Sequence, residues 1–329
     1  MKHVTIRDVA KLAGVGIATA SRAINNKGEV SPATRERVLE AAKRLGYVPN
    51  SLARGLISGK TKKIGVVITT ILNPFYAAVV SSIEDVLKDW GYTLALYNSK
   101  EDPSIEKEAI LLLISQRVDG LILAPIEYES ENIKYLIERT IPFILVGRNT
   151  VEENTNYVVC DDFKVGRLAA EHLISKGHRR ILFLNSWKSS SAKLRLEGFK
   201  TGLNEAGISV NSRFIYSVDP KTNLKDLMTY VFERKIKPTA IFCFCDSMAI
   251  DVMKFLKERK IRVPDDVAIM GCDNLDFTDL LEPPLTTVEI SKYDMGMKAA
   301  KILLNKLNKE KDEFEHVVFE PKLIVRSST

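Results

Sequence analysis

From Lys63 onward, the sequence alternates between short apolar runs and longer stretches whose apolar residues recur at helical spacing. The runs include "IGVVIT", "VDGLILAP", "RRILFLNS" and "VAIMGCD". Continuous apolar strands that alternate with helices are typical of parallel sheets built from βαβ units. The series is too long for one sheet, and the polar segment "NTVEENTN" divides it near residues 150–160. The sequence therefore predicts an α/β fold with two doubly wound lobes.

The boundaries of these lobes follow from the same pattern. We expect the first lobe to hold about residues 63–160 and 291–316, and the second about residues 161–290 and 317–329. The chain should cross between the lobes near residues 283–292 and again near its C-terminus. Ligands of such folds bind beyond the carboxyl ends of the strands. The cleft between the lobes is therefore the predicted ligand site.

Charged, amide and aromatic side chains follow several predicted strands. Charged groups form strong hydrogen bonds with hydroxyls, and rings cover apolar faces, so this set suits a polyol. Asp161, Asp162 and Asp246 could instead cap the helices that follow them, and Arg195 could belong to a solvated ion pair. The candidate ligand-binding residues are Asn73, Phe75, Arg148, Asp161, Ser191, Arg195, Asp246 and Asp273.

The N-terminal segment differs from the rest in charge. Residues 1–63 hold 13 Lys and Arg against 4 Asp and Glu, whereas the remaining residues are net acidic by three charges. A basic segment attached to a mildly acidic body favours contact with a polyanion such as nucleic acid. The alternative is a solvated basic surface with no partner.

Three short helices are predicted in this basic segment. Thr5 can cap the first helix, which Gly14 ends, and a second helix should cover residues 17–25. Ser31 and Pro32 are typical of the start of a third helix, which Gly46 ends. Two helices joined by a short turn that contains Gly form a helix-turn-helix. The spacing alone leaves open a small three-helix core in which Arg22 is merely exposed.

A helix-turn-helix places its second helix in the DNA major groove, so the entering face must be narrow. Ile17 and Ala18 are compact, and Arg22 can bond guanine through two hydrogen bonds. Thr19, Ser21 and Asn25 can bond phosphates. Further along, "YVPNSLARGLISGKTKK" predicts a short helix, and nothing in this segment is long enough to bury the apolar face of that helix. Its Leu56 could wedge into a minor groove.

The segments "VTIRDVAKLAGVGIATASRAIN" and "VSPATRERVLEAAKRLGYVPNSLARGL" resemble the LacI/GalR family of bacterial transcription regulators. The resemblance implies a DNA-binding domain at residues 1–48, a hinge helix and linker at 49–62, and an effector-binding and dimerisation core at 63–329 that is similar to periplasmic sugar-binding proteins. "SAKLRLEGF" and "GCDN" are similar to ligand motifs of the family, which strengthens Arg195 and Asp273. The implied DNA-binding residues are Thr5, Ile17, Ala18, Thr19, Ser21, Arg22, Asn25, Tyr47, Asn50, Ala53 and Leu56.

Two residues of the predicted DNA-binding domain at residues 1–48, called the head below, depart from the family pattern. Gly16 stands where the family usually has Ser, and Ala20 stands where it usually has Val. The first change removes a hydroxyl that could cap the second helix or bond a phosphate. The second places a smaller side chain between the helices and so reduces their packing contacts.

The resemblance implies a repressor of carbohydrate-utilisation genes that binds a palindromic operator as a homodimer and responds to a sugar-type effector. A purine or a phosphorylated metabolite remains open as the effector. We expect no enzymatic activity, no cofactor and no metal, because no nucleophile has an evident base and the four histidines are scattered. The alternatives are a solute-binding protein and a doubly wound enzyme. The N-terminus lacks the apolar segment of a secretory signal and no run could span a membrane, so a cytoplasmic location is expected.

Overall fold

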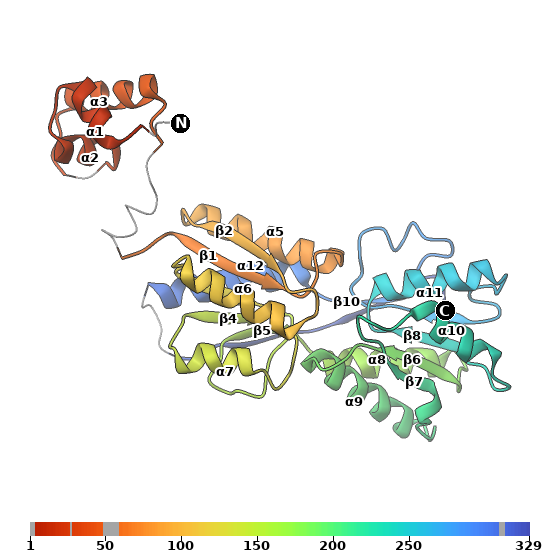
Figure 1. The fold of residues 1–329 in the computed structure, drawn as a ribbon. Helices are drawn as coiled ribbons and strands as arrows, with labels where there is room; N and C mark the ends of the chain where they lie inside the picture. Colours follow the sequence, from red (N-terminus) through yellow and green to blue (C-terminus); the bar gives the residue numbers. More distant parts are fainter. Residues whose placement is uncertain (1–3, 27, 49–58, 309–312) are drawn as a thin grey trace. The chain divides into compact units, whose positions relative to one another are not determined.

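The computed structural model describes residues 4–26, 28–48, 59–308 and 313–329 (Figure 1). They divide into two units, Met1–Thr61 and Lys62–Thr329. The first unit holds α1 (Ile6–Ala13), α2 (Ile17–Ile24) and α3 (Pro32–Leu45). Its small core is made by Val9, Ala10, Ala13, Ala20, Ala23, Val38 and Ala41. The three predicted helices of the basic segment are therefore present, whereas the predicted hinge helix lies outside the described residues.

Local signals set the ends of these helices. Asp8 accepts hydrogen bonds from the backbone N–H and the hydroxyl of Thr5, both at 2.8 Å, before the first turn of α1. The Ser31 hydroxyl accepts from Thr34 N at 3.3 Å and caps α3. Gly14 and Gly46 end α1 and α3 with φ near 64° and 62°, a left-handed conformation that glycine adopts without strain.

The second unit begins with a six-stranded parallel sheet. Its strand order is β11-β5-β4-β3-β1-β2. Helices α5 (Pro74–Asp89) and α12 (Lys292–Leu307) pack on one face, and α6 (Pro103–Ser115) and α7 (Glu131–Glu138) on the other. The strands are β1 (Lys63–Ile68), β2 (Thr93–Asn98), β3 (Gly120–Leu123), β4 (Phe143–Val146), β5 (Tyr157–Cys160) and β11 (His316–Phe319).

A four-stranded parallel sheet forms the second lobe, with the order β7-β6-β8-β9. Helices α8 (Asp162–Ser175) and α9 (Ser190–Glu205) cover one face, and α10 (Leu224–Glu233) and α11 (Asp246–Glu258) cover the other (Figure 1). The strands are β6 (Ile181–Asn185), β7 (Ile215–Ser217), β8 (Ala240–Cys243) and β9 (Ala268–Met270), and a short 3₁₀ helix, Ser212–Phe214, precedes β7. The prediction of two doubly wound lobes is confirmed.

The predicted lobe boundary near the C-terminus is wrong by a few residues. Strand β11 pairs with β5 through its last residue, Phe319, so residues 317–319 belong to the first lobe and not to the second. The reason is packing, since Val317 and Phe319 lie against the core beside β5. The crossing near residues 283–292 is present as β10 (Thr287–Glu289), which pairs antiparallel with β12 (Lys322–Ile324).

Helices α8 and α9 approach so closely that glycine is required at their contact. A Cβ atom built on Gly166 would lie 2.0 Å from the Arg195 carbonyl oxygen, and one on Gly198 would lie 1.9 Å from the Phe163 carbonyl oxygen. Neither backbone can move without separating the helices. This contact also fixes the positions of Arg195 on α9 and of Asp162 at the start of α8.

We expect Gly198→Ala to destabilise the second unit by about 2–3 kcal/mol, because the added methyl group meets backbone and not a flexible side chain. Gly202→Ala is the graded control, since its Cβ would lie 2.8 Å from the Cβ of Ala170 and no closer than 3.4 Å to backbone, at the Arg167 carbonyl oxygen. Urea unfolding of the full chain, followed by circular dichroism, measures both variants. Equal stability of the two variants would contradict the close-contact explanation.

Candidate functional site

The exposed face of α2 is narrow. Gly16, Ile17, Ala18 and Arg22 are exposed, with Ile17 at 48%, whereas Ala20 and Ala23 are buried against the other helices. Thr19 and Ser21 are half-buried on the flank. A face with so little bulk can enter a major groove about 12 Å wide and carry the Arg22 guanidinium to a base edge.

Other predicted DNA-binding residues have partners within the head. Asn25 donates from Nδ2 to the Ser21 carbonyl oxygen at 2.9 Å and ends α2, so it would have to give up this bond to reach a phosphate. Tyr47 is half-buried against the head core, and the N–H and hydroxyl of Thr5 bond Asp8. Asn50, Ala53 and Leu56 lie outside the described residues.

Gly16 is the N-cap of α2 and, at φ −68° and ψ 152°, has a backbone conformation open to any residue. No atom lies within 4 Å of a Cβ built there, and no side chain caps the helix. We therefore expect Gly16→Ser to stabilise the head by a few tenths of a kcal/mol, about what a serine cap adds over glycine. Thermal unfolding of the head signal measures this, with Gly16→Ala as control. A serine variant no more stable than the alanine variant would contradict the capping explanation.

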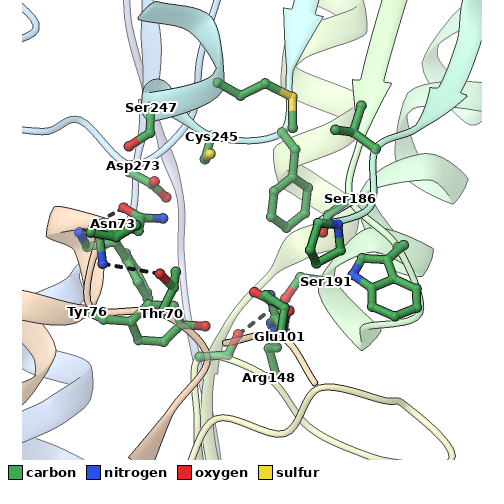
Figure 2. Close-up of a pocket in the computed structure, with 18 of the residues that line it drawn as sticks. Thr70, Asn73, Tyr76, Glu101, Arg148, Ser186, Ser191, Cys245, Ser247 and Asp273 are labelled. Carbon is green, nitrogen blue, oxygen red and sulfur yellow. Dashed lines mark hydrogen bonds and ion pairs between the residues drawn. The ribbon is translucent and has the colours of Figure 1, made fainter. Parts of the chain in front are cut away.

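A cavity of about 640 Å³ lies between the two lobes of the second unit. It is lined by the segments that follow β1, β2 and β4 in the first lobe and β6, β8 and β9 in the second. Asp273 and Ser247 lie toward one end, and Glu101 and Arg148 lie at the other (Figure 2). The aromatic side chains on its wall are Phe75, Tyr76, Trp187 and Phe244.

Two ion pairs, each with a buried arginine, lie on the wall of the cavity. Arg148 donates to both carboxylate oxygens of Glu101, at 3.1 and 3.3 Å. Arg195 donates from Nε to Asp162 Oδ1 at 2.7 Å and from Nη1 to the Phe244 carbonyl oxygen. Such pairs hold charged hydrogen-bonding groups in fixed positions in a site that water leaves when a ligand enters.

Known protein families and relatives match both units of the chain. The model of bacterial regulatory proteins of the lacI family matches residues 5–50, and that of a periplasmic binding protein-like domain matches residues 170–329. The HTH-type transcriptional repressor PurR of Histophilus somni (strain 2336) is 32% identical over 328 residues, 98% of each chain. The chain belongs to the lacI family of bacterial regulatory proteins. It is thus a DNA-binding transcriptional regulator.

Two solved structures are similar to this lacI-family regulator over nearly its whole length. The transcriptional regulator CelR in complex with cellobiose is 32% identical, with a TM-score of 0.75, over 99% of this chain and 100% of that one. The lac repressor dimer bound to operator and the anti-inducer ONPF is 26% identical, with a TM-score of 0.87, over 100% of this chain and 99% of that one. These similarities confirm the predicted family and fold.

Six of the eight residues predicted to bind the effector line the cavity of the regulator: Asn73, Phe75, Arg148, Ser191, Arg195 and Asp273. Asp161 does not, because its carboxylate accepts from Lys164 N at 2.9 Å and caps α8, which leaves the next residue, Asp162, to face the cavity. Asp246 does not line it either. This carboxylate is fully buried and accepts from Thr287 Oγ1 at 2.6 Å and from Leu275 N at 2.9 Å.

The buried Asp246 nevertheless supports the site, because Leu275 belongs to the loop that carries Asp273. Asp273 is itself buried, and its Oδ2 has no hydrogen-bond partner among the described residues. Burial, and then the carboxylate of Asp246, raise the pKa of Asp273 well above its ordinary value, which Arg195 offsets in part. A ligand that donates a hydrogen bond to Oδ2 would satisfy this atom.

Burial by itself lowers the pKa of Arg195, but the acidic neighbours Cys272 and Asp162 raise it, and the net shift is upward. Burial likewise opposes the charge on Arg148, and its neighbours Tyr76 and Glu101 raise its pKa overall. Both guanidinium groups therefore stay charged in the cavity. They can donate to a ligand at any pH at which the protein is folded.

Several cavity residues were absent from the sequence-based candidates, among them Thr70, Glu101, Ser186, Cys245 and Ser247. Glu101 follows β2, so the rule that ligands bind beyond strand ends would have found it if applied to "TLALYNSKED". Ser247 lies in the first turn of α11 and carries no such signal. Burial raises the pKa of Cys160 and Cys245 to about 12, so both thiols on the wall stay protonated.

The described residues hold no group of three or more His, Cys, Asp and Glu arranged to bind a metal ion. Within the same part of the chain, no helix is both long and apolar enough to cross a membrane.

Proposed function

We propose that this regulator is a repressor that binds a palindromic operator as a homodimer, in the cytoplasm, under the control of a sugar-type effector in the interlobe cavity. The observation that carries the DNA-binding part is the narrow exposed face of α2, with Arg22 one turn from its start. The lac repressor dimer solved on its operator supports the dimer. Two heads are needed because one short helix reads only a few base pairs.

The charge of the cavity supports a neutral effector. Four carboxylates line it, Glu101, Asp162, Asp219 and Asp273, against three cations, Lys100, Arg148 and Arg195. Both arginines are already paired with carboxylates, so a phosphorylated metabolite would enter a site with no cationic excess. Paired charges beside aromatic rings suit the hydroxyls and apolar faces of a sugar. The structure of CelR with cellobiose supports the same class.

Effector control would act through lobe closure. The cavity is lined by both lobes, so a ligand that contacts both favours one arrangement of the lobes over others. A change in closure would alter the spacing of the two heads of the dimer and hence the engagement of residues 49–62 with the minor groove. This hinge step, with Leu56 as the wedge, stays a prediction from the family resemblance.

We expect Arg22→Ala to weaken operator binding about 10- to 100-fold, because a bidentate contact to guanine discriminates by about 1–3 kcal/mol. Gel shifts with palindromic fragments that carry a central CG step, at two salt concentrations, measure this. Arg37→Ala is the matched control, since Arg37 is exposed on α3 and not on the narrow face. Equal losses in the two variants would show that α2 does not read the operator.

A fixed panel of ligands tests the effector class. It holds glucose, galactose, ribose, cellobiose, maltose and lactose, with guanine and hypoxanthine as the purine alternative. The proposal expects one or more of the sugars to raise the melting temperature and to change operator affinity in either direction. A response confined to the purines would replace the sugar effector by a purine and leave the repressor proposal standing.

A further inference from the structure

A second cavity, of about 550 Å³, lies next to the proposed effector cavity, and Ser186 and Trp187 line both. We propose that it is a subsite for a second hydroxyl-bearing ring of the same effector, so that the regulator responds to disaccharides in preference to monosaccharides. The inference rests on the sugar effector of the proposed function.

Two of the residues that line the second cavity, Asn185 and Trp187, each carry a buried polar atom without a hydrogen-bond partner among the described residues. Asn185 is 5% exposed, and its Nδ2 donates to the Ala192 carbonyl oxygen at 2.9 Å, which fixes the amide with Oδ1 as the free atom. This oxygen and the Trp187 Nε1–H are buried without a hydrogen-bond partner among the described residues. One is an acceptor and the other a donor. Hydroxyl groups both donate and accept, so a polyol can satisfy both atoms.

The charges of the second cavity also favour a neutral ligand. Lys188 Nζ lies 2.8 Å from Glu127 Oε1, and Lys193 Nζ lies 4.9 Å from the centre of the Tyr128 ring. Both lysines of the wall thus have partners, and Glu129 adds a second carboxylate to it. An anionic ligand would compete with Glu127 for Lys188, whereas neutral hydroxyls need no counter-charge.

Both lobes contribute to the second cavity, so a ring bound there would bear on lobe closure. Tyr128 N, from the first lobe, donates to the Lys188 carbonyl oxygen of the second at 2.9 Å, beside the Lys188–Glu127 ion pair. A ring held between these segments adds contacts that exist only in one arrangement of the lobes. Disaccharides would therefore shift the equilibrium further than monosaccharides that fill the first cavity alone.

The experiment compares the three monosaccharides and three disaccharides of the panel by isothermal titration calorimetry on the full chain. Asn185→Leu also breaks the bond to Ala192 and could unfold the lobe, so the main variant is Ser217→Phe. Ser217 is exposed on β7 and lines the second cavity but not the first, so a ring there fills the subsite. Its hydroxyl donates to the Ser186 carbonyl oxygen at 3.0 Å, so Ser217→Ala, which removes this bond without filling the subsite, separates the two effects. Ser212→Phe is the matched control, exposed in the same lobe and on neither cavity wall.

We expect Ser217→Phe to weaken disaccharide binding at least about tenfold and to change monosaccharide binding by less than about twofold, with Ser212→Phe changing neither. Undiminished disaccharide affinity in Ser217→Phe would overturn the subsite. So would a crystal structure of a disaccharide complex in which the second cavity holds ordered water only. If no sugar binds the natural chain, the subsite and the sugar effector fail together, while the Arg22→Ala gel shift still tests the repressor.

Discussion

Replacing Arg195 with methionine is expected to destabilise the second unit by about 3–5 kcal/mol and to abolish the response to the sugar panel. The side chains of Arg195 and Asp162 are only 6% and 4% exposed, so the variant leaves a buried carboxylate without its counter-charge. The Phe244 carbonyl oxygen also loses the hydrogen bond from Nη1. Methionine fills much of the same volume, which limits the contribution of lost packing.

The matched control is Arg167→Met, on the neighbouring helix. Arg167 pairs with Glu171 at 2.6 Å, but these side chains are 45% and 46% exposed, so solvent screens the pair and the loss of stability should be much smaller than for Arg195→Met. Adding Asp162→Leu to Arg195→Met should restore part of the stability, because it removes the unpaired charge, but not the effector response. Urea unfolding and the melting-temperature screen measure both properties. Equal destabilisation by the two single arginine variants would contradict the buried-pair explanation.

The fold of this regulator could be predicted where its signals are local. Helix ends in the head follow from Thr5, Gly14, Ser31 and Gly46, whose effects reach no further than one turn. The strands of both lobes are continuous apolar runs because both faces of each sheet are covered by helices. The error at β11 has the opposite origin, since nothing in the sequence near Phe319 shows that it pairs with Cys160.

The cavity residues, too, could be predicted only where the signal is local in the sequence. Strand ends identified Arg148, Arg195 and Asp273, because parallel strands bring their carboxyl ends to one edge. Whether Asp161 or Asp162 faces the cavity depends on which of the two is the N-cap of α8, and the sequence "VVCDD" does not show at which residue the helix begins. The pairing of Arg148 with Glu101 spans 47 residues, and only the packed sheet brings the two together.

Asp246 shows how burial can reverse an assignment. Its position after a strand predicted either ligand binding or a helix cap, and the structure shows neither. Cys245 is the N-cap of α11, and the Asp246 carboxylate bonds Leu275 and Thr287. Both partners come from segments about 30–40 residues further along the chain, so a sequence taken one segment at a time cannot reveal them.

Replacing Asp273 with asparagine is expected to stabilise the unliganded protein at pH 8 by about 1–2 kcal/mol and to weaken binding of the effective sugar about 10- to 100-fold. Asp273 has φ of 126°, a strained backbone conformation that asparagine tolerates at least as well, and its Oδ2 lacks a partner among the described residues. Burial and the nearby Asp246 carboxylate raise its pKa well above the ordinary value, so ionisation opposes folding. A group that destabilises the empty protein and bonds the ligand is typical of a binding site.

The stabilisation should depend on pH in one direction. An unfolded aspartate releases its proton near pH 4, while native Asp273 keeps it to a higher pH, so the native state binds more protons in between. The stability of the natural chain relative to Asp273→Asn therefore falls as pH rises above about 4, and the gap levels off once native Asp273 has ionised. Urea unfolding at pH 4.5 and pH 8 measures the gap, with the exposed Asp276→Asn as control. A gap that is larger at pH 4.5 than at pH 8 would contradict the upward shift, and undiminished sugar binding would remove Asp273 from the effector site.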